Sequence, residues 1–206
     1  AFELRGEQIR FAQAARTTFD ARRTLLAEAG TGVGKSFAYL LAAMERIVNH
    51  DERIVISTHT IALQEQLILK DIPLLLPFTG GRVRPVLVKG RGNYLSRRIL
   101  DLARKRRSER LTSPERASLE QIAEWAADST DGSLATLPQL ARRSVWELVQ
   151  SDSNNCLGGR CPRYGECFYQ SDRARMQSGN LLVCNHALYF SDLALRLSGA
   201  AMLPEH

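Results

Sequence analysis

The sequence predicts an α/β fold, in which a parallel sheet carries a phosphate-binding loop and a mostly helical, cysteine-containing domain is inserted into the sheet domain. Three observations predict it: short β-branched runs alternate with stretches of helical periodicity, a glycine-rich loop joins the first run to a helix, and three closely spaced cysteines follow a basic helical region. Strands that alternate with helices are typical of parallel sheets. We expect residues 1–92 and 179–206 to form the sheet domain and residues 93–178 the inserted domain.

Length and charge restrict the class of protein. A chain of 206 residues is long enough for one or two domains with hydrophobic cores. No apolar run approaches the ~20 residues of a membrane span, and Glu3, Arg5 and Glu7 interrupt the N-terminus, which argues against a signal peptide. We therefore expect a cytoplasmic monomer without a membrane partner. The formal net charge of +6 favours a polyanionic ligand.

A helix is predicted over residues 1–23, before the glycine-rich loop. Arg5 and Gln8 lie three residues apart and therefore on one side of a helical turn. A side-chain amide can both donate to and accept from an adenine edge, so a nucleotide contact is one interpretation. Spacing alone favours the other interpretation, a solvated helix face.

A phosphate-binding loop occupies residues 27–36. Residues 24–27 are short and apolar, as expected of a buried parallel strand, and apolar residues recur at helical spacing from Phe37 to Val48. Strand, glycine-rich loop and helix in this order are the context in which such a loop binds nucleotide phosphates. The alternative, an ordinary strand-to-helix turn, does not account for the sequence Gly34-Lys35-Ser36 that opens the helix.

The residue types of this loop fit the chemistry of ATP–Mg²⁺. Its glycines let backbone N–H groups approach phosphate oxygens, and a helix N-terminus favours an anion. Lys35 can reach the β- and γ-phosphates and Ser36 can hold Mg²⁺, so these two residues are the predicted catalytic residues. The predicted nucleotide-binding residues of the loop are Ala29, Gly30, Thr31, Gly32, Val33, Gly34, Lys35 and Ser36.

Three further strands are predicted, over residues 53–58, 84–88 and 180–184. The first ends in Ser57-Thr58-His59-Thr60, before a helix that runs from about Ile61 to Leu69. Hydroxyl and N–H groups at such a junction suit contacts with a nucleic-acid backbone, and N-capping by Thr58 or Thr60 is a compatible alternative. Asn185 and His186 follow the last strand, where ligand sites gather in open α/β sheets.

A strongly basic region follows the strand at residues 84–88. Between residues 97 and 110, seven Lys or Arg residues stand against two acidic ones, a net charge of +5. Exposed helix faces usually mix signs, so we interpret this region as a contact for phosphate backbones rather than as a solvated helix. The predicted nucleic-acid contacts are Thr58, His59, Lys89, Arg91, Asn93, Tyr94, Arg97, Arg104, Lys105, Arg106 and Arg107.

Cys156, Cys161 and Cys167 form a cluster in sequence, separated by four and then five residues that include glycine and proline. Thiolates at such spacing hold zinc or an iron–sulfur centre, and the spacing is wider than the Cys-x-x-Cys pairs of most zinc sites, which favours iron–sulfur. A disulfide with one free thiol is the alternative. Cys184 lies inside an apolar run and is expected in the core.

The order of the motifs resembles that of the DinG/XPD-type DNA helicases of superfamily two. The motifs are the phosphate-binding loop, the junction at residues 57–60, residues 89–95, the three cysteines and residues 183–188. The resemblance implies a partial RecA-like motor domain with an inserted iron–sulfur domain. It also implies ATP-dependent 5′-to-3′ DNA unwinding at the bacterial nucleoid, with single-stranded or forked DNA as the partner. It also implies that Arg5 and Gln8 read adenine and that Thr58 and its neighbours contact the DNA strand.

Two departures from the family pattern bear on the function. Ser96 stands where the family places its first cluster cysteine, and a hydroxyl is a weaker ligand than a thiolate. We therefore predict a 4Fe–4S cluster on Cys156, Cys161 and Cys167 with Ser96 as the candidate fourth ligand, and zinc or an empty site as the alternatives. The sequence Asp-Glu-Ala-His of the family is absent.

We interpret the chain as the N-terminal part of a longer helicase, whose DEAH strand, arch and second motor domain are its partners. The alternative is a nucleic-acid- or metal-binding module whose phosphate-binding loop does not hydrolyse ATP. A third interpretation, an unrelated kinase or transferase, accounts neither for the basic region nor for the cysteines.

Overall fold

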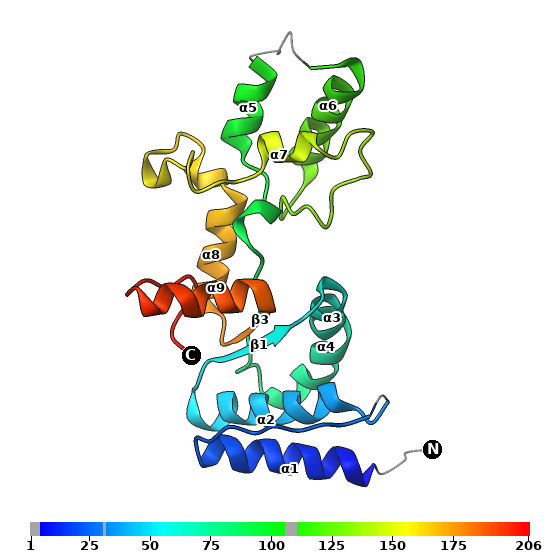
Figure 1. Cartoon of the computed structure of the whole chain (residues 1–206), viewed down its shortest axis with the longest axis vertical. Coiled ribbons are helices and arrows are strands. Elements are labelled where there is room, and N and C mark those ends of the chain that lie inside the picture. The colour runs from blue at the N-terminus through cyan, green and yellow to red at the C-terminus, as the bar shows by residue number, and fades with distance from the viewer. Residues whose placement is uncertain (1–4, 31, 106–110) are drawn as a thin grey trace. The chain divides into compact units, whose positions relative to one another are not determined.

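The computed structural model describes residues 5–30, 32–105 and 111–206, and the chain divides into two compact units (Figure 1). Unit 1 combines Ala1–Val88 with Met176–His206, and unit 2 is Lys89–Arg175. The α/β fold class is confirmed, because unit 1 contains a parallel sheet and unit 2 is mostly helical. None of the helices in the described ranges combines the length and apolar character needed to cross a membrane.

The sheet of unit 1 has three parallel strands, β1 (Ile54–Thr58), β2 (Pro85–Leu87) and β3 (Leu181–Asn185), in the order β1-β3-β2. The central strand β3 is therefore supplied by the part of the chain that follows unit 2. Its register against β1 places Thr58 beside Asn185, so that the two strands end together. The residues that follow these two strands consequently lie at the same edge of the sheet.

The core of unit 1 lies on both faces of the sheet, because side chains alternate along β3. Leu181 and Val183 face a cluster that includes Leu40, Met44, Ile47, Leu67 and Ile72. Leu182 and Cys184 face the opposite cluster, with Val88, Met176 and Leu203. Cys184 is fully buried, as the sequence predicts, and burial raises the pKa of its thiol to about 11.

The helices of unit 1 bring α1 (Gly6–Asp20) against α2 (Lys35–His50) (Figure 1). After β1 come α3 (Ile61–Gln66), a π-helical turn (Leu67–Asp71), α4 (Ile72–Leu75) and a 3₁₀ turn (Leu76–Thr79). The helix α9 (His186–Leu197) follows β3.

The predicted strand at residues 24–27 is wrong. Residues 24–30 have no regular secondary structure, and Leu26 is 98% exposed. A strand is stable only when its backbone groups pair with a neighbour, and in the described ranges the three paired strands are β1, β2 and β3. Residues 24–27 are therefore apolar but have no neighbouring strand in the described ranges with which to pair.

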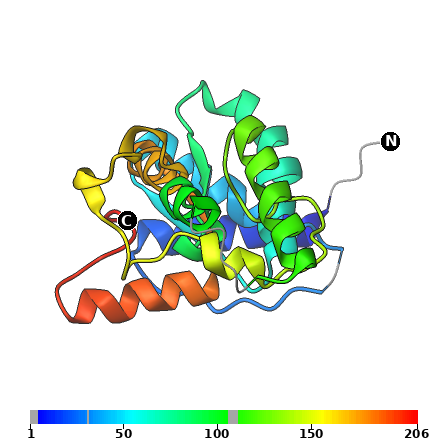
Figure 2. The same ribbon diagram turned by 90° about the horizontal axis from the view of Figure 1, so that it is seen from above.

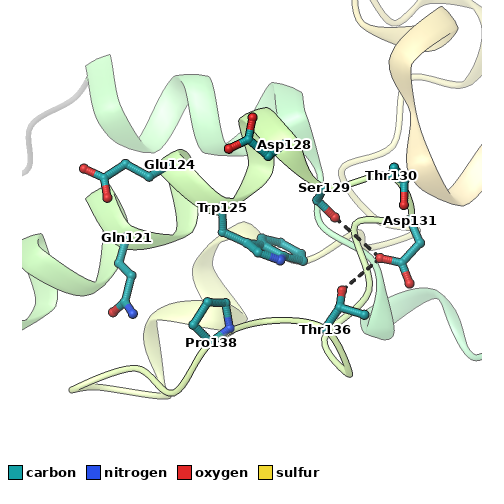
Figure 3. A pocket seen from close by; sticks show the side chains of 9 residues that line it. All are labelled: Gln121, Glu124, Trp125, Asp128, Ser129, Thr130, Asp131, Thr136 and Pro138. Atoms are coloured by element: carbon teal, nitrogen blue, oxygen red, sulfur yellow. Dashed lines mark hydrogen bonds between the residues drawn. The ribbon is translucent and has the colours of Figure 1, made fainter.

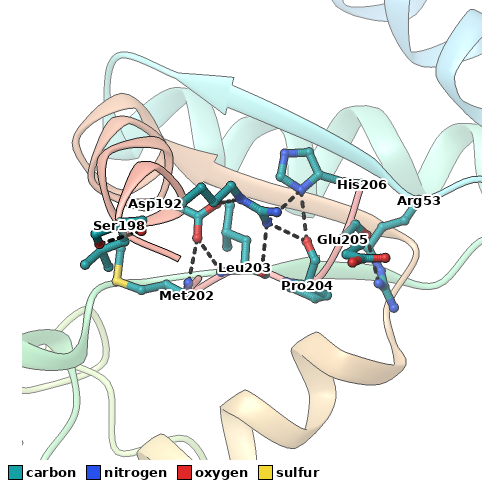
Figure 4. Close-up of polar contacts among 10 residues, drawn as sticks. Arg53, Asp192, Ser198, Met202, Leu203, Pro204, Glu205 and His206 are labelled. Atoms are coloured by element: carbon teal, nitrogen blue, oxygen red, sulfur yellow. Dashed lines mark hydrogen bonds and ion pairs between the residues drawn. The ribbon is translucent and has the colours of Figure 1, made fainter. Parts of the chain in front are cut away.

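A polar network fixes the segment after α9 (Figure 4). The buried Asp192 carboxylate accepts hydrogen bonds from the backbone N–H groups of Met202 and Leu203, at 2.6 and 2.8 Å, and from Arg196 Nε at 2.6 Å. Arg53 donates to the carbonyl of Glu205. Burial acts to raise the pKa of Asp192, but the bonds from Arg196, Leu203 and Met202 hold this pKa below its usual range.

Unit 2 is built from α5 (Arg97–Lys105), α6 (Ser113–Asp128), α7 (Val145–Val149), most of α8 (Phe168–Ser178) and 3₁₀ turns at Arg91–Asn93, Gly158–Arg160 and Tyr164–Glu166. The helices α5 and α6 lie side by side in both views (Figures 1 and 2). Their core includes Tyr94, Leu100, Ile122, Val145 and Trp146. A capping box between Thr112 and Glu115 starts α6.

Candidate nucleotide-binding site and nucleic-acid interface

The glycine-rich loop ends in two residues that adopt left-handed backbone angles. Gly32 has φ +80° and Gly34 has φ +81°, a region that side chains disfavour. A Cβ added at Gly34 would also collide with the side-chain amide of Gln8. The left-handed backbone conformation favours glycine at Gly34, and a larger residue there would also have to move the flexible Gln8 amide.

The N-terminal residues of α1 bring two predicted nucleotide contacts to this loop. Arg5 Nη1 donates to the Gly32 carbonyl at 2.6 Å, and Gln8 Nε2 donates to the Gly34 carbonyl at 3.1 Å. Arg5 is the N-cap residue of α1 and Gln8 lies in the first turn, so both side chains reach the loop from the start of this helix.

The two predicted catalytic residues lie at the start of α2. The exposed Lys35 Nζ donates to the Ala29 carbonyl at 2.8 Å, so the ammonium group spans the loop. Ser36 is half-buried, and its hydroxyl hydrogen-bonds Tyr39, whose pKa is raised mainly by burial. Val33 is half-buried and Gly30 exposed in the same loop, and Thr31 lies outside the described residues.

The edge of the sheet where β1 and β3 end carries two capped helix starts. Thr60 Oγ1 accepts from the Leu63 N–H at 3.2 Å, and Asn185 Oδ1 accepts from the Leu188 N–H at 2.8 Å. Thr60, not Thr58, is thus the cap of α3. Thr58 is only 8% exposed and donates to the Thr60 carbonyl, so burial argues against the predicted contact of Thr58 with nucleic acid.

Two side chains that the sequence did not connect meet at this edge. Ser57 Oγ on β1 lies 2.6 Å from His186 Nδ1 at the start of α9. The His186 ring also lies near the exposed His59, with ring centroids 6.1 Å apart. The sequence signal for this arrangement is that Ser57 and His186 each lie within one position of the last residue of a strand, because β1 ends at Thr58 and β3 ends at Asn185.

Several predicted basic contacts in unit 2 have partners within the unit. Lys89 Nζ donates to Ser133 Oγ at 2.7 Å, and Arg104 forms an ion pair with Glu120 at 2.9 Å. Two guanidinium groups stack on aromatic rings: that of Arg91 is 3.9 Å from the Tyr169 ring centroid, and that of Arg97 is 4.4 Å from the Phe168 ring centroid. Lys105 is exposed, and Arg106 and Arg107 lie outside the described residues.

Tyr94 is a core residue rather than a surface contact. It is 2% exposed, and its hydroxyl donates to Asp172 at 2.5 Å. Burial raises the pKa of Tyr94. Asn93 donates to the Gly90 carbonyl and so closes a turn. The aromatic residue in the basic glycine-rich loop therefore anchors unit 2, because a large ring gains more from burial than from exposure.

The four predicted cluster ligands line one small pocket of unit 2, namely Ser96, Cys156, Cys161 and Cys167. The cysteines are free thiols, and no group of three His, Cys, Asp or Glu residues in the described ranges is arranged to hold a single metal ion. The Gly158 N–H and Arg91 lower the pKa of the Cys156 thiol. Ser96 Oγ accepts from the Ile99 N–H at 3.4 Å, so it serves the start of α5. The structure thus brings the three thiols and Ser96 to one pocket.

A second pocket in unit 2 is separate from these residues (Figure 3). It is open, has a volume of about 550 Å³, and is lined in part by Glu124, Trp125, Asp128 and Asp131. Its carboxylates do not suit a polyanion such as DNA or ATP.

Comparison with known proteins places this site in a family. The family model described as "DEAD/DEAH box helicase" matches residues 10–126. The chain is 32% identical to the ATP-dependent DNA helicase YoaA of Escherichia coli over 99% of the chain and 32% of that protein. It is 37% identical to the ATP-dependent helicase DinG of Mycobacterium tuberculosis, over 98% of the chain and 32% of that protein.

A third relative, the ATP-dependent DNA helicase DinG of Photobacterium profundum, is 30% identical over 89% of the chain and 27% of that protein. The chain thus spans about a third of the length of the relatives it matches. The family match covers more than half of the chain and includes the glycine-rich loop, α2, β1 and α3. The chain belongs to the DEAD/DEAH box helicase family.

Proposed function

We propose that this chain is the nucleotide- and DNA-binding part of an ATP-dependent DNA helicase that moves 5′-to-3′ along one strand in the cytoplasm. The observation that carries the proposal is the convergence of Arg5, Gln8 and Lys35 on the carbonyl groups of one glycine-rich loop. The printed names of the relatives support it. The unwinding cycle is assigned to a longer protein that also supplies a DEAH strand, an arch and a second motor domain.

On nucleotide binding, the side chains at the loop would exchange their present hydrogen-bond partners for phosphate oxygens and Mg²⁺. Lys35 exchanges the neutral Ala29 carbonyl for β- and γ-phosphate oxygens, which are stronger acceptors because they are charged. The N-terminus of α2 adds a favourable dipole, and Ser36 exchanges Tyr39 for Mg²⁺. Arg5 and Gln8 lie beside the loop, where they can contact adenine.

DNA contacts are proposed within each unit by itself. In unit 1 the exposed His59 lies at the carboxyl edge of the sheet, where a strand backbone can approach. In unit 2, Arg91, Arg97 and Lys105 supply positive charge, and stacking on aromatic rings fixes the first two guanidinium groups. Such contacts position a phosphate backbone without reading base sequence.

The cysteine pocket of unit 2 is proposed to hold a 4Fe–4S cluster. In such a cluster each cysteine binds a different iron, so the thiols need not surround one ion, and the shared pocket of Cys156, Cys161 and Cys167 supports this arrangement. Zinc is less favoured, because it requires its ligands around a single centre. When bound, the cluster would join Ser96, near the start of unit 2, to the loop at residues 156–167 and so contribute folding energy.

Metal analysis after anaerobic purification tests the cluster. We expect about four iron and four sulfide per chain, as a 4Fe–4S centre requires, retained by Cys184→Ala and lost in Cys161→Ser. The matched control is Cys184, which is fully buried in the core of unit 1. Stoichiometric zinc, or a metal-free chain that is ordered at residues 156–167, would contradict the cluster and leave the nucleotide proposal standing.

Two equilibrium titrations of the chain test the main proposal. We expect it to bind ATP in the presence of Mg²⁺ and to bind a single-stranded oligonucleotide. Hydrolysis should be very slow, because the sequence lacks the Asp-Glu-Ala-His motif, whose acidic residues complete Mg²⁺ coordination. Absence of either binding activity would contradict the proposal. Rapid DNA-stimulated ATP hydrolysis by these 206 residues would contradict the assignment of the unwinding cycle to a longer protein.

A further inference from the structure

A row of three rings lies at the edge of the sheet where β1 and β3 end. The His59 and His186 ring centroids are 6.1 Å apart, and the His186 and Phe190 centroids are also 6.1 Å apart. His186 and Phe190 lie four residues apart on α9 and therefore on one face of that helix. The row thus joins the loop after β1 to the first turns of α9.

The middle ring of the row is fixed in place. The hydrogen bond between Ser57 Oγ and His186 Nδ1 ties the α9 ring to β1. Because β1 and β3 are paired in parallel up to Thr58 and Asn185, the two ends of this bond are held by the sheet. The ring row is therefore a preorganised surface rather than a set of independent side chains.

The outer rings are open to solvent. Phe190 is 60% exposed and His59 is exposed, so neither ring is used to fill the core of unit 1. Rings alone would suit a protein partner as well as a nucleic acid. Here two of the three rings are polar imidazoles, and the Ser57 hydroxyl contacts the middle one. The row also lies at the N-terminus of the 12-residue helix α9, whose dipole favours anions. That combination of π-faces with an anion-favouring edge fits single-stranded nucleic acid.

We propose that His59, His186 and Phe190 form a stacking surface for unpaired bases of a single strand, with Phe190 as the principal platform. The inference rests on the proposed DNA-binding function and deepens it, because it assigns residues that contact bases rather than phosphates. Stacking uses the face that every base has, so the surface is indifferent to sequence. A strand passing the end of the sheet would place a base on Phe190 and its backbone near the start of α9.

The test measures binding of two labelled single strands of equal length, oligothymidylate and an abasic strand, by fluorescence anisotropy. We expect wild type to prefer the thymidylate strand. Phe190→Ala and Phe190→Leu should weaken thymidylate binding about ten-fold and leave abasic binding nearly unchanged, because leucine keeps apolar area but has no π-face. The matched control is Phe78→Ala, which removes another highly exposed ring of unit 1.

A second readout reports stacking directly. A strand carrying 2-aminopurine should change its fluorescence on binding wild type and change it much less on binding Phe190→Ala. Equal wild-type affinity for both strands, or thymidylate binding unchanged in Phe190→Leu, would overturn the stacking surface while DNA binding stands. If wild type binds neither strand, the proposed DNA-binding function itself fails.

Discussion

The Ser57 hydroxyl lies 2.6 Å from His186 Nδ1, although the two residues are 129 positions apart in the chain. The sheet brings them together, because β3 lies between β1 and β2 although it follows unit 2 in the sequence. A contact of this kind makes the orientation of one surface ring depend on a small side chain of another strand.

Ser57→Ala should therefore weaken binding of oligothymidylate. The hydrogen bond that orients His186 contributes about 1 kcal/mol to the folded arrangement, so its loss should weaken affinity by up to roughly five-fold. Anisotropy titration measures the change in affinity. Ser191→Ala is the control, because the Ser191 hydroxyl donates to the Ala187 carbonyl within α9. Unchanged affinity in Ser57→Ala would show that the His186 ring needs no support from β1.

Gly34→Ala should destabilise unit 1. A residue with a Cβ at φ +81° costs about 1–2 kcal/mol, and the new methyl group must displace the Gln8 side chain. Thermal or urea unfolding measures the change. Gly30→Ala is the matched control, since its backbone is not left-handed and a Cβ there meets nothing within 4 Å. Equal stability of the two variants would contradict the loop conformation described above.

Asp192→Asn should lower the free energy of unfolding by about 2 kcal/mol at neutral pH, because the carboxylate accepts charge-assisted bonds from Arg196 and two backbone N–H groups. The folded-state pKa of Asp192 lies below its usual value. Its stabilisation is therefore fully present above the unfolded-state pKa of about 3.9 and is lost as pH falls through the lower folded-state value.

Urea unfolding of wild type and Asp192→Asn across pH tests the direction of the pKa shift of Asp192. The difference between the two proteins should be constant from about pH 5 to 8 and should shrink below about pH 4. A difference that grows on acidification would contradict the assignment of the lowered pKa to Asp192.

Replacing Lys105, Arg106 and Arg107 by Gln should reduce the salt dependence of single-strand binding. Each phosphate contact contributes about 0.7 to the log–log slope for single strands, so three contacts give a reduction of up to about 2. Arg104→Gln is the comparison, because Arg104 is already paired with Glu120. An unchanged slope in the triple variant would identify this basic region as a solvated helix.

The sequence predicted the elements whose signals are local. Glycine positions indicate the loop at residues 27–36, and a β-branched run predicts β1. The apolar run around Cys184 predicts the burial of that residue. The strand at residues 24–27 was predicted from apolarity alone, and it failed because pairing depends on neighbours that sequence does not display. Tyr94 failed for a related reason, since a ring in a basic loop gives no sign of whether it faces solvent or the Asp172 carboxylate.

The sequence named candidate site residues but could not predict their contacts. Arg5 and Gln8 do reach the loop, yet spacing alone favoured a solvated face, because the packing of α1 on α2 is a tertiary effect. Which basic residues are paired, as Arg104 is, also depends on tertiary structure.

Calorimetric titration of the chain with ATP–Mg²⁺, in wild type and in Lys35→Ala, tests the central proposal most directly. Lys35 spans the loop from the start of α2 and is the charge placed to meet the β- and γ-phosphates. The control is Lys70→Ala, which removes an exposed lysine of the same unit. We predict binding by wild type and Lys70→Ala, and a loss of at least ten-fold in Lys35→Ala, as expected for removal of a charge-assisted contact of about 1.5–3 kcal/mol. Equal affinities in all three proteins would contradict the assignment of this loop as the nucleotide site.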